Sequence, residues 1–182
     1  MILTDREIRI FIEHGQIQIR PEPAEQRYSS TAVDLTLAAR IQVWNFPNAR
    51  DFVIRPGRPG YKYEDIREKH SDALEITNGY VLEPAHFILA WTLEEIELPY
   101  QTRIAARVEG KSSLARLGIG VHVTASTIQS GFSGPLQLEM YNHGTARVEL
   151  LPGMPICQLI FEMTLGTPEK GYSGQFKYQR LP

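Results

Sequence analysis

The first residues of the chain carry the polar and apolar pattern of a short amphipathic helix. Thr4 and Glu7 have the spacing of a capping box, in which each side chain accepts a hydrogen bond from the other residue's backbone N–H. Leu3 and Ile8 are spaced for the hydrophobic contact that often accompanies such a box. Gly15 is a natural stop. We therefore predict a helix between Thr4 and Gly15.

Beyond this helix the apolar period changes to two. Residues 33–44 alternate apolar with smaller or polar side chains, the pattern of a half-buried strand. From Ala73 onward, turn signals such as Asn78-Gly79 and Pro152-Gly153 separate further β-patterned runs. The strands predicted there are 73–76, 80–82, 87–95, 103–109, 120–124, 136–142, 147–151 and 156–164. Many short strands at this spacing indicate a mainly β fold, either a sandwich, a jelly roll or a barrel.

Two segments interrupt the β pattern. Residues 45–69 contain three prolines and two glycines, and they predict an excursion with one short strand at 51–55 and a helical turn at 63–69. Residues 112–117 predict a short internal helix, capped by Ser112 or Ser113 and stopped by Gly118. The polar tail 167–182 is either simply disordered or a flap that closes over an anionic ligand.

The length of 182 residues favours one domain over residues 1–182, which should bury roughly 70% of its unfolded surface. With 19 basic and 21 acidic residues, the chain lacks the basic excess of a nucleic-acid binder, so any anion site must be local. No run approaches the roughly 18 apolar residues of a membrane span. The charged N-terminus and the lone Cys157, which lies in an apolar run, favour a reducing, cytoplasmic setting.

A cluster of hydroxyls and cations is the first candidate for chemistry. Two hydroxyls and two cations lie within six residues, on Ser112, Ser113, Lys111 and Arg116. Together with backbone N–H groups, these side chains could hold phosphates. A Walker P-loop is not indicated, because Ala105 stands where its first glycine is needed. A solvated turn is the alternative interpretation.

Glu139 is the second candidate. Strand alternation places Gln137, Glu139 and Tyr141 on one face and the apolar Leu138 on the other. A glutamate on a polar strand face is usually just solvated. If an apolar surface or another subunit excluded water from the site, Glu139 would instead become a candidate proton shuttle.

Two other classes of site find little support in the sequence. A zinc nucleobase deaminase needs a Pro-Cys-x-x-Cys element, which a chain with one cysteine cannot supply. The five histidines show no close ligand spacing, and His122, in the predicted strand 120–124, is interpreted as a packed or surface residue. A Ser–His–Asp hydrolase stays open, although no nucleophile-elbow motif supports it.

Several runs of the chain together resemble the dCTP deaminase family, a branch of the trimeric dUTPase superfamily. They are 110–118, 121–125, 131–134, 138–139, 152–154 and 158–159, with further likeness at the N-terminal helix, 30–37 and 177–178. The resemblance implies a dUTPase-like β-barrel or jelly-roll (β-clip) subunit in a homotrimer with active sites between subunits. It implies hydrolysis of dCTP to dUTP and ammonia without a catalytic metal, which would feed dUMP and dTTP synthesis.

The resemblance also implies roles for individual residues. Glu139 resembles the general acid/base of the family. Ser112 and the Ala125 carbonyl resemble the groups that position the water, and Arg116 resembles an electrostatic partner near the site. The substrate-binding residues implied are Lys111, Ser112, Ser113, Leu114, Ala115, Arg116, Gln129, Gln137, Leu138, Gln158, Tyr172 and Lys177. Mg²⁺ would arrive on the triphosphate, and dTTP would act as a feedback inhibitor.

The chain departs from the family pattern at residues 126–129 and near its C-terminal end. Gln129 stands where many members carry an aspartate, which in dUTPases helps to activate the water that attacks phosphorus, so diphosphatase activity is doubtful. Ser126-Thr127 replaces the His-Arg or Gly-Trp pair of other members, and near the end only Gln179 comes close to a family glutamine. Two alternatives stay open: a dUTP or dCTP diphosphatase, alone or as a bifunctional enzyme, and a nucleotide-binding module without turnover.

Overall fold

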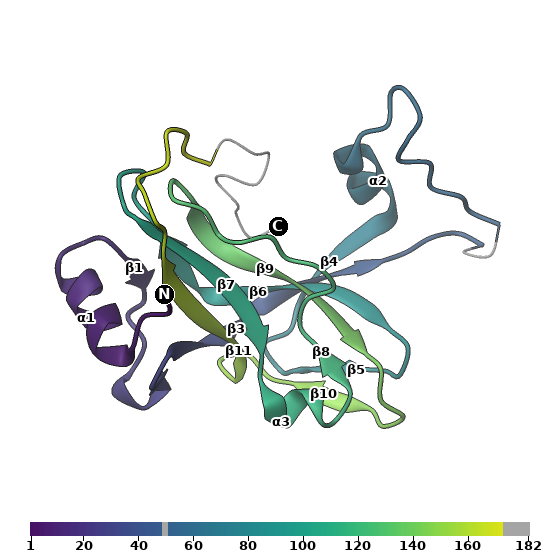
Figure 1. The fold of residues 1–182 in the computed structure, drawn as a ribbon. Helices are drawn as coiled ribbons and strands as arrows, with labels where there is room; N and C mark the ends of the chain where they lie inside the picture. Colours follow the sequence, from purple (N-terminus) through teal and green to yellow (C-terminus); the bar gives the residue numbers. More distant parts are fainter. Residues whose placement is uncertain (49–50, 173–182) are drawn as a thin grey trace.

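A computed structural model describes residues 1–48 and 51–172, and strands are the main regular secondary structure in it (Figure 1). The strands are β1 (Gln18–Arg20), β2 (Tyr28–Ser29), β3 (Ala32–Trp44), β4 (Ser71–Glu75), β5 (Tyr80–Leu82), β6 (Phe87–Glu97), β7 (Ile104–Gly110), β8 (Ile119–Gly120), β9 (Ser133–Asn142), β10 (Val148–Leu150) and β11 (Pro155–Met163). The helices are α1 (Asp5–Glu13), a 3-10 turn η1 (Glu25–Arg27), α2 (Tyr63–His70) and α3 (Ser112–Ala115). The mainly β prediction is confirmed, and no helix in the described part of the chain is long and apolar enough to cross a membrane.

The predicted N-terminal helix is confirmed as α1. The Thr4 backbone N–H donates to the Glu7 carboxylate at 3.3 Å, and the Thr4 hydroxyl donates to the same group. These bonds hold the pKa of Glu7 below its ordinary value. Leu3 and Ile8 are both buried, and Gly15 has a φ of +67° after the last turn. Local capping chemistry alone therefore defines both ends of this helix.

One curved sheet wraps around the core in the order β7-β11-β3-β6-β9-β8, and β5 and β10 form a separate pair. The long strand β3 joins its two halves, with Leu35 opposite Cys157 of β11 and Ile41 opposite Ala90 of β6. The register shifts between Leu37 and Ile41, where β3 bends from one half to the other. Such an irregularity increases local twist and helps the sheet to curl.

A buried carboxylate ties the strands together at a neighbouring irregularity in β6. Glu94 accepts hydrogen bonds from the backbone N–H and the hydroxyl of Thr36, both at 2.8 Å. The Thr92 hydroxyl donates to the Glu94 carbonyl at 2.8 Å and accepts from the Leu136 N–H at 2.9 Å. Because these buried groups have partners, the network links β3, β6 and β9 without leaving a polar atom desolvated and unpaired.

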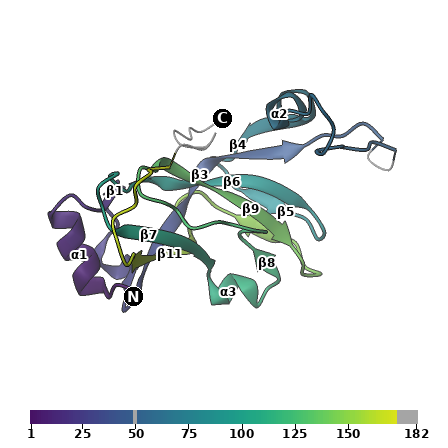
Figure 2. The same ribbon diagram turned by 45° about the horizontal axis from the view of Figure 1, so that its top comes forward.

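The segment between β3 and β4, residues 45–70, extends away from the sheet as an arm that carries α2 (Figures 1 and 2). The predicted helical turn is confirmed as α2, but the predicted strand at 51–55 is wrong. Val53 and Ile54 are exposed, and no strand in the described part of the chain pairs with them. An apolar run without a partner strand has no ladder to join, so its β pattern is not realised.

The predicted strand at 120–124 is also wrong beyond its start, because β8 ends at Gly120. His122 therefore does not lie in a strand. Farther along this loop, the backbone N–H groups of Val123 and Thr124 donate to the Glu139 carboxylate at 3.0 Å each. A side chain takes the place of a partner strand here, and the chain leaves the sheet.

The turn after α3 depends on a glycine. Gly118 has a φ of +91°, and a Cβ atom built on it would lie 2.4 Å from the Gly144 nitrogen. We expect Gly118→Ala to lower the free energy of unfolding by about 3 kcal/mol, since it adds left-handed backbone strain to a backbone clash. Urea denaturation measures the change. Gly166→Ala is the control, because nothing lies within 4 Å of its added Cβ; equal stability of the two variants would contradict this account.

Candidate functional site

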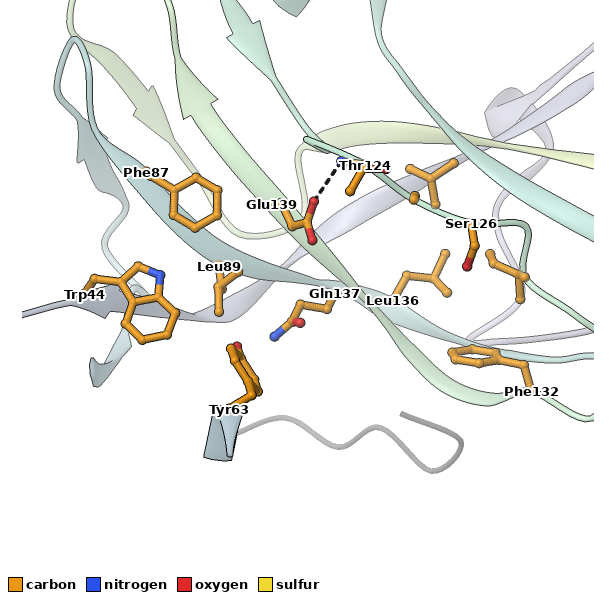
Figure 3. A pocket seen from close by; sticks show the side chains of 13 residues that line it. Trp44, Tyr63, Phe87, Leu89, Thr124, Ser126, Phe132, Leu136, Gln137 and Glu139 are labelled. Carbon is orange, nitrogen blue, oxygen red and sulfur yellow. Dashed lines mark hydrogen bonds between the residues drawn. The ribbon is translucent and has the colours of Figure 1, made fainter. Parts of the chain in front are cut away.

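A pocket of about 420 Å³ opens where the arm, the loop after β8 and strand β9 meet (Figure 3). The floor is the β6–β9 pair, whose register places Leu89 opposite Glu139 and Trp91 opposite Gln137. The lining residues are Trp44, Tyr63, Phe87, Leu89, Val108, Thr124, Ala125, Ser126, Ile128, Phe132, Leu136, Gln137 and Glu139. The sheet thus supplies a rigid base, while the arm and the loop supply the walls.

Strand alternation orients the polar side chains of the pocket. Gln137 and Glu139 point into it, whereas Leu138 between them is fully buried in the core. Leu138 can therefore offer a ligand only its backbone. The same carboxylate oxygen of Glu139 accepts both N–H bonds from Val123 and Thr124. This pair of bonds fixes the carboxylate against the loop at the edge of the pocket.

The loop after β8 brings Ala125 to the same pocket. Ala125 and Ser126 line it together with Glu139. The loop is anchored farther along, where Ile128 and Ala106 exchange backbone hydrogen bonds of 2.6 and 3.0 Å. Gln129 follows Ile128, is exposed, and does not line the pocket.

The predicted phosphate-binding residues lie elsewhere on the same chain. Residues 111–116 form α3 and its flanks, and none of them lines the Glu139 pocket. Ser112, Ser113, Ala115 and Arg116 are exposed, and Leu114 is partly buried against the core. Within the described ranges, no ion pair involves Arg116. A single protomer therefore does not bring these groups together with Glu139.

Lys111 is already engaged in the chain. Its ammonium forms an ion pair with the Asp34 carboxylate, and both side chains are largely buried. Gln158 donates to the other Asp34 oxygen at 3.1 Å. The charge of Lys111 is thus neutralised locally, which makes Arg116 the more available cation of this segment.

The C-terminal segment reaches the far end of the pocket. Tyr172 donates its N–H to the Ser130 carbonyl at 2.9 Å, and its ring lies 6.3 Å from that of Phe132, a lining residue. Tyr172 is therefore near the pocket rim. Lys177 lies in the part of the tail, 173–182, that is outside the described residues.

The sequence interpretation missed most of the pocket lining, including the aromatic residues Trp44 and Tyr63. Both belong to the arm side of the pocket and face Gln137 across it (Figure 3). Burial raises the pKa of the Tyr63 phenol; Arg67 opposes this rise, and the negative charge of Glu139 adds to it. The aromatic residues directly before and within the proline-rich excursion were the signal that could have identified this wall.

Cys157 is buried in β11, as its apolar surroundings predict. Burial raises the pKa of its thiol well above the ordinary range; Glu94 and Asp34 add to the rise, and Lys111 opposes it. Since the thiolate is the reactive form, we expect no labelling of the native protein by a thiol reagent at neutral pH. One thiol should react after unfolding in guanidinium, and rapid labelling of the folded protein would contradict the assigned burial.

Among the described residues, no three His, Cys, Asp or Glu side chains gather as a group that could hold a metal ion.

Comparisons with known proteins all indicate similarity to dCTP deaminases. A family model described as dCTP deaminase-like matches residues 2–164. The "dCTP deaminase, dUMP-forming" of Aquifex aeolicus is 36% identical over 181 residues, or 99% of this chain and 91% of that protein. The counterpart of Methanosphaera stadtmanae is 35% identical over 172 residues, covering 94% and 83%. The "dCTP deaminase" of Rhodospirillum rubrum is 35% identical over 188 residues, covering 100% and 94%.

Solved structures share the fold. The crystal structure of 2'-deoxycytidine 5'-triphosphate deaminase from Agrobacterium tumefaciens matches with a TM-score of 0.66 at 24% identity, covering 89% of this chain and 48% of that one. A mutant dUTPase from phage phi11 of S. aureus matches with a TM-score of 0.52 at 12% identity, covering 87% and 97%. The dUTPase-like fold expected from the sequence is thereby confirmed.

Proposed function

The chain belongs to the dCTP deaminase-like family, and on this basis we propose that it hydrolyses dCTP to dUTP and ammonia at the Glu139 pocket. One observation of geometry supports this proposal above the others. Glu139 is held by two backbone N–H groups at the edge of a pocket that also contains Gln137 and Ala125. That arrangement offers one fixed carboxylate, an amide and a carbonyl to a small polar ring.

The proposed chemistry is proton transfer by one carboxylate. Glu139 takes a proton from a water molecule while the water oxygen adds to C4 of cytosine. Glu139 then delivers a proton to N3 of the ring. The tetrahedral intermediate then collapses: Glu139 passes the proton of the new C4 hydroxyl to the exocyclic amine, the C4–N bond breaks as the C4=O bond forms, and ammonia leaves. The Ala125 carbonyl and the Ser112 hydroxyl would position the water. Gln137 would read the base through its amide, which can both donate and accept.

We further propose a homotrimer whose sites form between protomers. Ser112, Ser113 and Arg116 are exposed on α3, away from the pocket of their own chain. Leu117, just after α3, is 58% exposed, and Val123, in the loop that lines the pocket, is 68% exposed. Apolar side chains at these positions fit a surface that another copy covers. In such an assembly, α3 of one protomer would hold the triphosphate of a nucleotide whose base lies in the neighbour's pocket.

The remaining parts of the proposal follow the family. Mg²⁺ would enter on the triphosphate as part of the substrate, and the protein would supply no catalytic metal. Tyr172 and Lys177 would close on the phosphates. A dTTP molecule in the same pocket would inhibit, with its methyl group against the loop 123–127. We place the enzyme in the cytoplasm, with no nucleic acid or membrane as a partner.

The product is proposed to be dUTP, although four of the similar relatives bear the name dUMP-forming. Gln129 is neutral and cannot act as the base that a phosphorus-directed water would need. Incubation of purified protein with dCTP and magnesium tests the proposal, with ammonia, dUTP, dUMP and pyrophosphate resolved. Ammonia and dUTP in equal amounts are expected. Pyrophosphate without ammonia would favour a diphosphatase, and nucleotide binding without product would favour a module that lacks turnover.

A further inference from the structure

The arm of residues 45–70 is built around an aromatic cluster. Phe46 stacks on Trp44 with ring centroids 5.3 Å apart and on Phe52 at 5.2 Å. His70, at the end of α2, meets the Phe52 ring edge-on at 4.6 Å. Tyr63, at the start of α2, meets the Trp44 ring edge-on, with centroids 6.3 Å apart and planes 73° apart. The cluster therefore joins both ends of the arm to α2 and holds these rings in defined orientations.

Only part of this cluster faces the pocket. Trp44 and Tyr63 line it together with Glu139, whereas Phe46 and Phe52 do not. Phe46 covers one face of the Trp44 indole. Because their planes are nearly perpendicular, Trp44 and Tyr63 make a corner beside Gln137 (Figure 3). A flat ring placed in such a corner stacks on one aromatic ring and meets the other edge-on, the two arrangements that aromatic pairs prefer.

The charge of the pocket indicates which part of a nucleotide fits it. In the part of the chain that the structure describes, the lining includes no lysine, arginine or histidine, and Glu139 contributes a carboxylate. A triphosphate would be repelled there. A neutral planar ring with hydrogen-bonding edges suits the aromatic corner, Gln137 and Glu139. The base end of the ligand therefore belongs in this pocket, and its phosphates belong outside it.

We propose that Trp44 and Tyr63 form the wall against which the pyrimidine ring of the substrate lies, so that the arm is part of the base-recognition site. This inference rests on the proposed function, because it takes the ligand to be a cytosine nucleotide. The two residues contact the substrate and do not move protons. Their loss weakens nucleotide binding while the chemistry at Glu139 continues.

The first test separates contact with the base from support of the arm. Stacking of a base on an aromatic side chain predicts that Trp44→Leu raises KM for dCTP by about 10-fold with a smaller change in kcat. Trp44→Phe keeps a flat ring and should retain most of the affinity. Phe52→Leu is the matched control, since Phe52 belongs to the same cluster but does not line the pocket. Equal KM changes in Trp44→Leu and Phe52→Leu would overturn the inference in favour of a purely structural cluster.

The second test is spectroscopic and needs no turnover. Trp44 and Trp91 are the two tryptophans of the sequence, and Trp91 is 1% exposed. Addition of dCTP to a Glu139→Gln variant should quench tryptophan fluorescence, and a further Trp44→Phe substitution should remove most of this response. Calorimetry on the same samples reports binding independently. If dCTP binds without a Trp44 signal, this inference alone is overturned. If dCTP does not bind and the parent protein releases no ammonia, the proposed function is overturned as well.

Discussion

Glu139→Gln is expected to abolish deamination while dCTP still binds. Glutamine has nearly the same shape, and its amide oxygen can accept the N–H bonds from Val123 and Thr124 that now hold the carboxylate. It cannot take up or release a proton at neutral pH. General acid–base catalysis typically contributes about 10²- to 10⁴-fold to a rate, so a loss of at least that size in kcat is expected. Ammonia release measures turnover, and calorimetry measures dCTP affinity.

A matched substitution controls for the change of charge. Glu149→Gln alters an exposed glutamate in β10 that does not line the pocket, and it should keep the activity of the parent protein. If Glu139→Gln retained turnover within about tenfold of this control, the assignment of Glu139 as the proton carrier would be wrong. A loss of both turnover and dCTP binding would instead indicate a role in binding.

Mixing two inactive variants should restore activity. Arg116 and Glu139 lie in separate regions of one chain, so a site that uses both must combine two protomers. Arg116→Ala and Glu139→Gln should each be nearly inactive alone. After the two are unfolded and refolded together at equal amounts, about one site in four of a cyclic trimer carries both intact residues. Ammonia release by the mixture, compared with each variant refolded alone, measures the recovery.

The control mixture uses two changes in the same pocket. Gln137→Ala and Glu139→Gln affect neighbouring positions on β9 that face one cavity, so no arrangement of these two chains yields an intact site. No recovery is expected there. If the Arg116→Ala mixture also failed to recover while mass measurement showed mixed oligomers, the shared site would be refuted.

The parts of the fold that depend on neighbours in sequence were predictable. The capping residues Thr4 and Glu7 define α1, and period-two alternation on β9 correctly separates Glu139 from the buried Leu138. The failed strand at 120–124 has a different origin. Val123 alternates as a strand residue should, but its N–H bonds to the Glu139 side chain, sixteen positions away, and its own side chain is exposed.

The candidate site depends on contacts that local patterns do not contain. Lys111 was predicted to bind phosphate, but its charge is neutralised within the chain by an ion pair with Asp34. The two residues are 77 positions apart, so local patterns do not reveal the pair. Trp44 and Tyr63 become neighbours only because the arm folds back on itself. The resemblance to a family identified the acidic residue at the pocket edge, but it said nothing about the aromatic wall that faces it.

The pairing of β3 with β4 has a consequence for engineering. The arm leaves the sheet after Trp44 and returns at Ser71, which is the residue paired directly with Trp44. Because the strand ladder closes the base of this insert, the barrel does not depend on the length of what lies between, and such sites tolerate replacement. Swapping in arms of different length and ring content would therefore retune which nucleobases are accepted while the proton-transfer machinery stays in place.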